Sequence, residues 1–229
     1  MKDRYFSETP LSGESVTLQG SEAHHLLHVM RAEPGLEVVV FDGLGGEWSA
    51  EIACLGRAEV ELTLQEHAAI ERENSAEISL AVPLPKGDRQ RWLIEKCVEL
   101  GVTHLIPLTT ARSTKNSAEA SAKLTRYVIE ASKQCGRNRL MQIEQPQSWS
   151  TLAACGLAPL RVLAHPNGAP LSEIETGDSV LLAVGPEGGF TDTEISLAVE
   201  SNWQVVSLGE RILRIETAAL AMVSQWVLR

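Results

Sequence analysis

The segment Val180–Gly189 (VLLAVGPEGG), followed by Leu208–Ala219 (LGERILRIETAA), decides the fold of this 229-residue chain. The apolar run Val180–Val184 is typical of a strand buried on both faces of a sheet. A turn of glycine and proline ends this run, and Thr191 with Glu194 forms a capping box that predicts a helix start. In open α/β sheets, glycines in such a turn let the backbone approach a ligand. The sequence therefore predicts a ligand site after this strand.

A second strand–loop–helix unit follows. The strand Gln204–Leu208 ends at Gly209, and a helix comes next. The apolar face of this helix is formed by Ile215, Ala219, Met222 and Trp226. The two strand ends are expected side by side in a parallel sheet, with their loops lining one pocket. No Lys-Ser/Thr pair follows the glycine turn, and Glu187 would repel a phosphate, so a triphosphate ligand is not expected.

From Ile78 onward, strand and helix patterns alternate. This alternation predicts an α/β fold with a parallel sheet covered by helices on both faces. The expected strands are Ile78–Leu84, His104–Leu108, Arg161–Ala164, Val180–Val184 and Gln204–Leu208. The expected helices ahead of the glycine turn are Asp88–Leu100, which ends at Gly101, and Ala118–Cys135.

The sequence pattern predicts a small β-rich unit from residue 1 to about residue 72. Its expected strands are Val16–Leu18, Leu36–Phe41, Trp48–Cys54 and Val60–Leu64. One helix, Ser21–Ala32, is expected to begin at Ser21 as its N-cap. The residues of this helix expected to face inward are Leu26, Val29 and Met30. The charged segment His67–Glu77 is interpreted as a linker.

The charge of the chain is unevenly distributed. The net charge is −10, yet residues 84–140 carry eleven basic and five acidic side chains, a local charge of +6 that leaves −16 elsewhere. Such a basic segment favours contact with phosphates, although ordinary solvated helix faces would give the same count. Four scattered cysteines predict reduced thiols without a disulfide or a metal site. Short apolar runs and a charged beginning lead us to expect a cytoplasmic protein.

Several motifs resemble the SPOUT class of RNA methyltransferases, and specifically the RsmE-type family that methylates N3 of a uridine in 16S ribosomal RNA. They are KGDRxxWxxxKxxELGV from Lys86, EAxxQxGR from Glu130, GPEGGF from Gly185 and LGxxILRxETA from Leu208. The segment HHLxxVxR from His24 extends the resemblance to nearly the whole chain. The two departures from the family pattern are Ile215, where Thr is expected, and Cys135, where a small residue is expected.

This resemblance implies a particular architecture. It implies a PUA-like β-barrel RNA-binding domain at 1–72 and a SPOUT methyltransferase domain at 76–229, with a carboxyl-terminal trefoil knot. It further implies a homodimer, S-adenosylmethionine (SAM) as cofactor, and 16S ribosomal RNA or the small ribosomal subunit as partner. The strongly apolar run Ala218–Val223 agrees with a dimer contact.

The SAM pocket is expected in the loops after three strands. In SPOUT enzymes the cofactor carries the reactive methyl group, so the protein chiefly binds and orients it. The expected cofactor-binding residues are Leu163, Ala164, His165, Gly185, Pro186, Glu187, Gly188, Gly189, Leu208, Gly209, Ile212, Leu213, Arg214, Thr217 and Ala218.

Methylation at uridine N3 sets a further demand, because this nitrogen is protonated at neutral pH. The reaction calls for a general base or for a group that stabilises the uridine anion. Arg214 is the expected stabiliser, and Glu187 and Glu216 are the candidate bases. Alternatively, Arg214 forms a structural ion pair with one of these carboxylates, or the carboxylates serve the sulfonium or cap backbone N–H groups.

Basic side chains at strand and helix ends are the candidates for RNA contacts. They are Arg4, His24, His25, Arg31, Lys86, Arg89, Arg91, Arg112 and Arg137, together with Gln134. A solvated or structural role remains the alternative for each of them.

The sequence is also compatible with other functions. A SPOUT enzyme could act on another RNA or on a ribose 2′-OH, and a non-catalytic RNA-binding factor of ribosome assembly could retain the fold. An α/β enzyme with a nucleotide cofactor is disfavoured, because the chain lacks Gly-x-Gly-x-x-Gly.

Overall fold

The computed structural model describes residues 3–113, 121–156, 158–175 and 177–228. The chain forms two compact units. The first consists of Met1–Glu73 together with Ile129–Leu140, and the second of Asn74–Val128 together with Met141–Arg229. The first unit is therefore assembled from two stretches that are far apart in the sequence.

The first unit contains a curled five-stranded sheet in the order β1-β3-β4-β5-β2. Its strands are β1 (Arg4–Phe6), β2 (Ser15–Leu18), β3 (Glu37–Phe41), β4 (Glu47–Leu55) and β5 (Val60–Ala68). β1 runs parallel to β3, and the other neighbours are antiparallel. The four expected strands are confirmed, and β1 was not expected. Tyr5, Leu26, Ile52 and Leu62 are fully buried between the sheet and the helical segment that follows β2.

This helical segment differs from the expected Ser21–Ala32 helix. A short α-helix, α1 (Gly20–His24), has Gln19 as its N-cap and continues into a π-helix, η1 (His25–Met30). Leu26 is buried as expected, but Val29 is 61% and Met30 41% exposed. The wider π-helical turn shifts the residues that follow it out of the 3.6-residue period on which the expectation rested.

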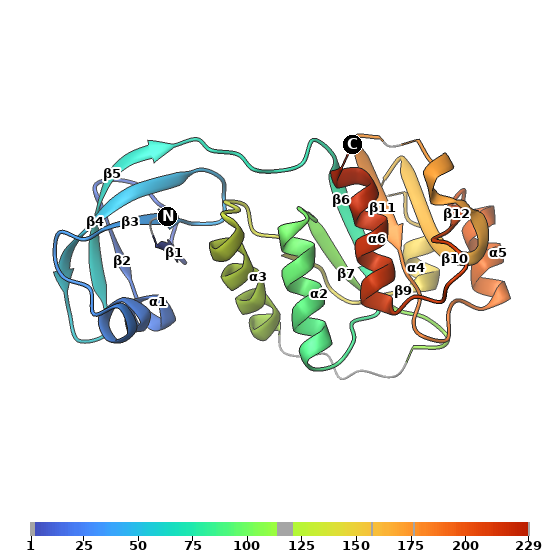
Figure 1. Ribbon diagram of the computed structural model, residues 1–229, viewed down its shortest axis with the longest axis horizontal. Coiled ribbons are helices and arrows are strands. Elements are labelled where there is room, and N and C mark those ends of the chain that lie inside the picture. Colours follow the sequence, from blue (N-terminus) through green and yellow to red (C-terminus); the bar gives the residue numbers. More distant parts are fainter. Residues whose placement is uncertain (1–2, 114–120, 157, 176, 229) are drawn as a thin grey trace. The chain divides into compact units, whose positions relative to one another are not determined.

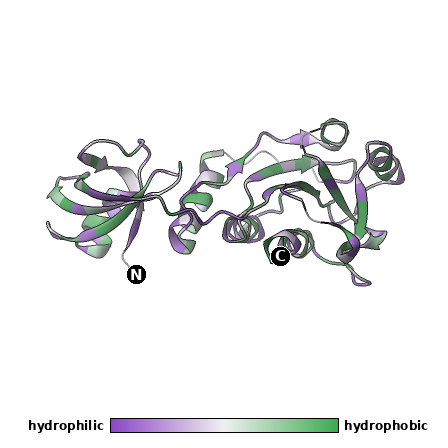
Figure 2. Ribbon diagram, turned by 90° about the horizontal axis from the view of Figure 1, so that it is seen from above, coloured by the Kyte–Doolittle hydropathy of each residue, from purple (hydrophilic) through white to green (hydrophobic). Residues whose placement is uncertain are grey.

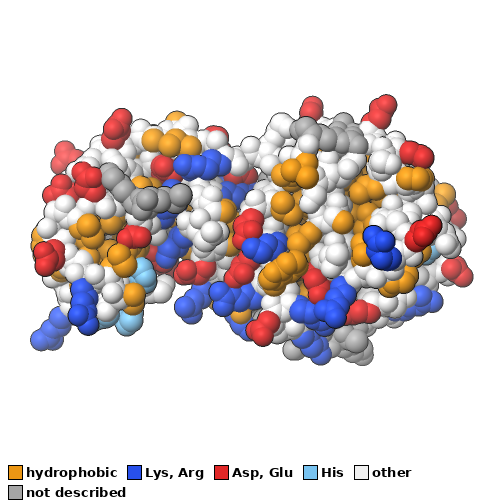
Figure 3. All heavy atoms as spheres, in the orientation of Figure 1, with side chains coloured by type: hydrophobic (Ala, Val, Ile, Leu, Met, Phe, Trp, Pro, Cys, Tyr) orange, Lys and Arg blue, Asp and Glu red, His pale blue; other side chains and the backbone are white. Residues whose placement is uncertain are grey.

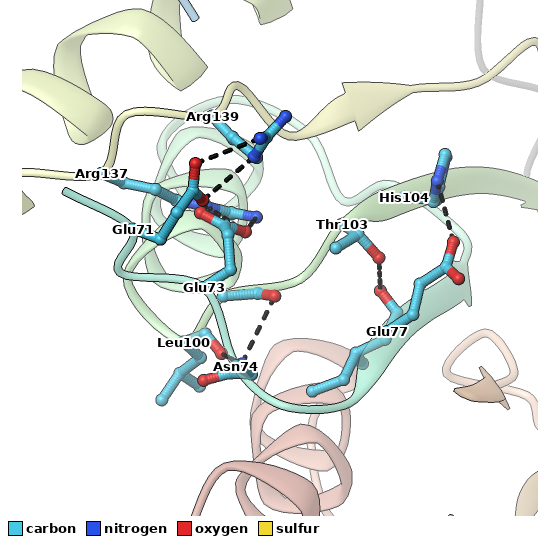
Figure 4. A network of polar contacts seen from close by, with 11 residues as sticks. Glu71, Glu73, Asn74, Glu77, Leu100, Thr103, His104, Arg137 and Arg139 are labelled. Carbon is cyan, nitrogen blue, oxygen red and sulfur yellow. Dashed lines mark hydrogen bonds and ion pairs between the residues drawn. The ribbon is translucent and has the colours of Figure 1, made fainter. Parts of the chain in front are cut away.

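Ion pairs join the 129–140 stretch to the rest of the first unit. Arg137 donates from two nitrogens to the carboxylate of Glu73, with an Nη2–Oε2 distance of 2.6 Å. Arg139 pairs with Glu71 in the same manner, and Figure 4 shows the two arginines facing the two glutamates. Bidentate pairs of this kind fix the orientation of both side chains.

Glu47 forms a second such link. Arg4 Nη1 lies 2.5 Å and Arg72 Nη1 3.0 Å from Glu47 Oε2, and Arg4 also bonds Asn138. Burial alone would raise the pKa of Glu47. The hydrogen bonds from Arg72 and Arg4 outweigh burial and lower the pKa from 4.5 to about 2.

The second unit is built on a sheet in which every pair of neighbouring strands is parallel, in the order β12-β10-β11-β6-β7-β8, with β9 paired to β7. Its strands are β6 (Glu77–Val82), β7 (His104–Thr109), β8 (Gln142–Ile143), β9 (Gln147–Ser148), β10 (Leu160–Pro170), β11 (Ser179–Ala183) and β12 (Gln204–Ser207). Its helices are α2 (Asp88–Glu99), α4 (Trp149–Ala153), η2 (Leu171–Glu173), α5 (Asp192–Glu200) and α6 (Ile215–Val227), and α3 (Ser121–Cys135) runs from this unit into the first.

Helices cover both faces of this sheet, and its strands are largely hydrophobic (Figure 2). α6 returns from the edge strand β12 to pack on β6 and β11 beside α2 (Figure 1). The predicted class, a parallel α/β sheet preceded by a small β-barrel-like unit, is confirmed; the trefoil knot stays a prediction. The expected beginning of α3 at Ala118 lies outside the described residues.

One expectation about the sheet is wrong. β11 and β12 are not neighbours, because β10 lies between them and pairs with both. The carboxyl ends of all three strands still lie at one edge of the sheet, since the strands are parallel. Within the described part of the chain, no helix is long and apolar enough to cross a membrane.

Candidate active site

An excursion within β10 and the loops after β11 and β12 line a cavity of about 280 Å³. This volume is close to the lower end of the range for small-molecule sites, about 300–1,000 Å³. The lining residues are Arg112, Ala164, His165, Pro166, Val184, Gly185, Pro186, Glu187, Gly188, Gly189, Phe190, Leu208, Gly209, Arg211, Ile212, Leu213 and Ala218. The wall is thus mostly glycine and small or aliphatic side chains, with Glu187 as its carboxylate.

An excursion of β10 forms the first of the three loops. Ala164 and Ala169 both align with Val206 of β12, so the residues between them leave the sheet and reach the cavity. Gly168 lies at the return point, where a Cβ would overlap the backbone of Val206. A glycine is therefore required for the chain to come back against β12.

Arg112 holds the glycine loop after β11. Its Nη1 donates to the carbonyl oxygen of Gly188 at 2.7 Å and to that of Phe190 at 3.4 Å. A Cβ on Gly188 would lie 3.3 Å from Arg112 Cδ, and one on Gly185 would lie 3.0 Å from the Phe190 ring. Gly189 has a φ of 67°, which an L side chain rarely adopts. The loop shape thus depends on its glycines and on Arg112.

The helix after this loop starts as the sequence predicted. Thr191 and Glu194 form the capping box of α5. The second oxygen of Glu194 accepts a 2.8 Å bond from the backbone N–H of Ala111, the residue before Arg112. The Trp149 ring packs on Phe190 at 4.9 Å and donates through Nε1 to the carbonyl of Glu194. These contacts fix the base of the glycine loop.

Arg89 lies between the two candidate carboxylates. Its Nη1 is 3.8 Å from Glu187 Oε1 and 3.9 Å from Glu216 Oε1. The Glu187 side chain is 64% exposed, whereas that of Glu216 is only 9% exposed. The ion pair that was considered for Arg214 is therefore made by Arg89, from the first turn of α2.

Arg214 itself is the N-cap residue of α6 and is exposed. Across the residues that the structure describes, its side chain has no hydrogen-bond or ion-pair partner. It directly follows Ile212 and Leu213, which line the cavity. Its guanidinium is thus available at the start of α6, where the backbone N–H groups of the helix are also unpaired.

The structure brings most of the expected cofactor-binding residues together in this cavity. Leu163 is an exception, because it is fully buried in the core of the second unit. Arg214 and Thr217 also lie outside the lining. Pro166 and Arg211 lie within the loops predicted to form the pocket, Leu163–Pro166 and Leu208–Ala218, and the structure confirms that they line it. Lining residues outside the predicted pocket are Arg112, Val184 and Phe190, of which Val184 and Phe190 directly flank the predicted loop Gly185–Gly189.

Two expected RNA contacts are corrected by the structure. The side chain of Arg4 is 7% exposed and binds Glu47, and that of Arg137 is 4% exposed and binds Glu73. Each guanidinium is enclosed and already neutralised, so it is not presented to an RNA phosphate. The side chains that remain exposed or half-buried are His24, His25, Arg31, Lys86, Arg89, Arg91, Arg112 and Gln134.

In the folded structure, carboxylates from other parts of the chain lie close to several basic side chains of residues 84–140. Lys133 pairs with Glu22 at 2.9 Å, and Arg137 and Arg139 pair with Glu73 and Glu71; all three carboxylates lie outside residues 84–140. Figure 3 shows acidic and basic side chains interspersed over the visible face of each unit. Much of the local charge of +6 is therefore balanced by nearby carboxylates. Lys115 lies outside the described residues.

Comparison with known proteins identifies the class. A family model for an RNA methyltransferase domain matches residues 72–227, and one for an RNA methyltransferase PUA domain matches residues 18–65. The chain therefore belongs to the RNA methyltransferase family, and the resemblance found in its motifs is confirmed.

The chain is similar to several ribosomal RNA small subunit methyltransferases. It is 36% identical over 222 residues to the ribosomal RNA small subunit methyltransferase E of Synechocystis sp., covering 92% of this chain and 72% of the relative. The protein of the same name from Bacillus subtilis is 29% identical, with 96% and 94% covered. The crystal structure of the Neisseria gonorrhoeae protein, bound to S-adenosyl methionine, superposes with a TM-score of 0.90 at 30% identity, with 98% and 96% covered.

Proposed function

We propose that this protein transfers a methyl group from SAM to N3 of a uridine in 16S ribosomal RNA. The observation that carries the proposal is the three-loop cavity at the carboxyl edge of a parallel sheet, in a chain whose relatives are ribosomal RNA small subunit methyltransferases. The sequence resemblance supplies the choice of uridine N3.

The cavity fits SAM chemically. Its small and aliphatic side chains, among them Ala164, Val184 and Leu213, suit the flat adenine ring, and the glycine backbone offers N–H and C=O groups to the ring edge. Glu187 places a carboxylate in the wall, which suits the cationic sulfonium and ammonium groups of the cofactor. SAM supplies a methyl carbon already activated by its sulfonium. The protein has to orient this carbon toward the base.

Arg214 is the residue to which we assign stabilisation of the reacting uracil. Loss of the N3 proton places negative charge on the ring, and a guanidinium beside it stabilises that charge as it develops. Arg214 is exposed, has no partner in the described part of the chain, and adjoins the cavity-lining residue Leu213. It is thus free to contact the base.

The two candidate bases are less suited to direct proton transfer. Glu216 is enclosed and does not line the cavity. Glu187 does line it, but a carboxylate next to the cationic cofactor is a weaker proton acceptor, because the positive charge favours its ionised form. We therefore assign Glu187 to the cofactor, and the main chemical contribution of the protein to Arg214.

The RNA is expected to contact exposed cationic and polar side chains of both units. In the first unit these are His24, His25, Arg31 and Gln134, and in the second unit Lys86 and Arg91. The His24 ring packs against the His28 ring at 4.8 Å between centroids, tilted by 56°, and exposed histidine rings of this kind can contact unpaired bases. Figure 3 shows histidine side chains grouped on the first unit.

We further propose that the protein is a cytoplasmic homodimer. The apolar run of α6 gives little support, because Ala218, Ala219, Met222 and Val223 are buried within the chain itself. Ile212, a lining residue of the cavity, is 83% exposed, and a second copy of the chain could cover it. Light scattering coupled to gel filtration measures the oligomeric state directly.

Mass mapping of 16S ribosomal RNA tests the proposed reaction. RNA from cells that lack the protein should miss one 3-methyluridine, and purified protein with SAM should restore it on RNA or on small subunits from those cells. A missing methyl group on a ribose or on another RNA would favour a related enzyme instead. SAM binding without transfer to any ribosomal RNA would favour a non-catalytic assembly factor.

A further inference from the structure

Arg89 is placed between two carboxylates without a hydrogen bond to either. The distances from Nη1, 3.8 Å to Glu187 and 3.9 Å to Glu216, exceed the 2.7–3.2 Å of an N–H···O bond. The three residues come from separate segments: the first turn of α2, the glycine loop and the first turn of α6. The guanidinium is therefore attracted to both carboxylates at once and can close onto one of them by a small side-chain rotation.

Glu216 lacks a partner that it needs. Its Oε2 atom is buried and accepts no hydrogen bond in the structure as described, and its side chain is only 9% exposed. Buried carboxylate oxygens almost always accept hydrogen bonds, because leaving them unpaired is costly. Among the described residues, Arg89 is the cation within ion-pair distance of this carboxylate. Arg89 faces the other oxygen, Oε1, and a two-pronged approach of its guanidinium to the carboxylate would bring a donor to Oε2 as well.

Glu187 is the partner that Arg89 would leave. It lines the cavity, where the cationic groups of SAM attract its carboxylate. Arg89 and the cofactor thus compete for Glu187. This step rests on the proposed function, since it takes SAM as the ligand.

We propose that Arg89 changes partners when the cofactor binds. Without cofactor, Arg89 is shared between Glu187 and Glu216. With cofactor, Glu187 turns toward the cationic groups in the cavity, and Arg89 closes onto Glu216. Glu216 is then a positioning residue, which strengthens cofactor binding through Arg89 although it does not line the cavity.

SAM affinity measured by calorimetry on four proteins tests this exchange: wild type, Glu216→Gln, Arg89→Met and the double variant. Glu216→Gln should weaken SAM binding about 3- to 5-fold, the scale of a partly exposed ion pair, because Arg89 then stays on Glu187. Arg89→Met should bind SAM at least as tightly as wild type. In the Arg89→Met background, Glu216→Gln should have no further effect. Glu95→Gln is the matched control. Glu95 lies on α2, like Arg89, but it pairs with Arg91 and does not line the cavity, so this variant should bind SAM with wild-type affinity.

A second cycle avoids any change at the buried position. In a Glu187→Gln background, Arg89→Met should bind SAM as tightly as its Glu187→Gln parent, because Arg89 and the cofactor no longer compete for a carboxylate at this position. Equal effects of Glu216→Gln in both Arg89 backgrounds, or an Arg89→Met protein that binds SAM more weakly than wild type, would overturn the exchange alone. A wild-type protein that does not bind SAM would overturn the proposed function and this proposal with it.

Discussion

Replacing Arg112 by Met tests whether this side chain shapes the cofactor loop or contacts RNA. Met has a similar length but cannot donate the 2.7 Å bond to the carbonyl of Gly188. A hydrogen bond from a charged group contributes about 1.5–3 kcal/mol when enclosed. Arg112 is exposed, so solvent screening reduces this to about 1 kcal/mol. If that free energy holds the loop in its binding shape, SAM affinity falls about 5-fold.

Calorimetry with SAM measures this change, and Arg126→Met is the matched control. Arg126 is an exposed arginine of the same basic segment and lies outside the cavity lining, so its loss should leave SAM affinity unchanged. The reasoning is refuted if Arg112→Met binds SAM normally. If RNA affinity also drops and its log–log salt slope decreases by about 1, Arg112 is a phosphate contact, as the sequence first suggested.

Three further predictions concern other parts of the molecule. Gly185→Ala places a Cβ against the Phe190 ring, which should lower the free energy of unfolding by about 1–3 kcal/mol in chemical denaturation and weaken SAM binding. Gly177→Ala is the control, because a Cβ there meets no atom within 4 Å. Equal stability of the two variants would contradict the packing argument. Arg214→Ala should slow single-turnover methylation roughly 100-fold with little loss of SAM affinity, and a rate loss explained by SAM occupancy alone would remove Arg214 from the chemistry. The lowered pKa of Glu47 means that its ion pairs with Arg4 and Arg72 stabilise the fold above pH 4.5, and that this stabilisation is lost as the pH falls toward 2. Glu47→Gln should therefore lack this part of the acid dependence in urea unfolding, whereas parallel curves for the two proteins would count against the assignment.

Local patterns were enough to predict the elements around the site. The apolar run of β11, the capping box at Thr191 and the apolar face of α6 are each encoded within a few neighbouring residues. The sequence could not reveal which strand lies between β11 and β12, because neighbours in a sheet are set by the path of the whole chain. The excursion of β10 could not be predicted for the same reason, because it is a shift in pairing relative to Val206 on another strand.

The roles of charged side chains were the hardest to predict. Arg137 and Glu73 are 64 residues apart in the chain, and nothing in either local pattern marks them as partners. Arg112 follows a strand end, as expected, yet its bond to Gly188 spans 76 residues. The π-helix at His25–Met30 likewise breaks the period from which inward-facing residues were inferred. Composition therefore indicated a basic segment, but not which of its charges were already paired.

The interrupted first unit has a consequence for biosynthesis. All strands of its sheet have been synthesised once Ala68 has been added. The partners of Glu22 and Glu73, Lys133 and Arg137, are synthesised much later, and the second stretch of the unit ends only at Leu140. At a synthesis rate of about 5–20 residues per second, the intervening chain takes about 3 to 13 s to emerge. During that interval the carboxylates of Glu22 and Glu73 in the nascent first unit lack their ion-pair partners. A fragment cut at Glu73 would remain in that state indefinitely, so a stable isolated first unit requires residues 129–140 to be supplied as well.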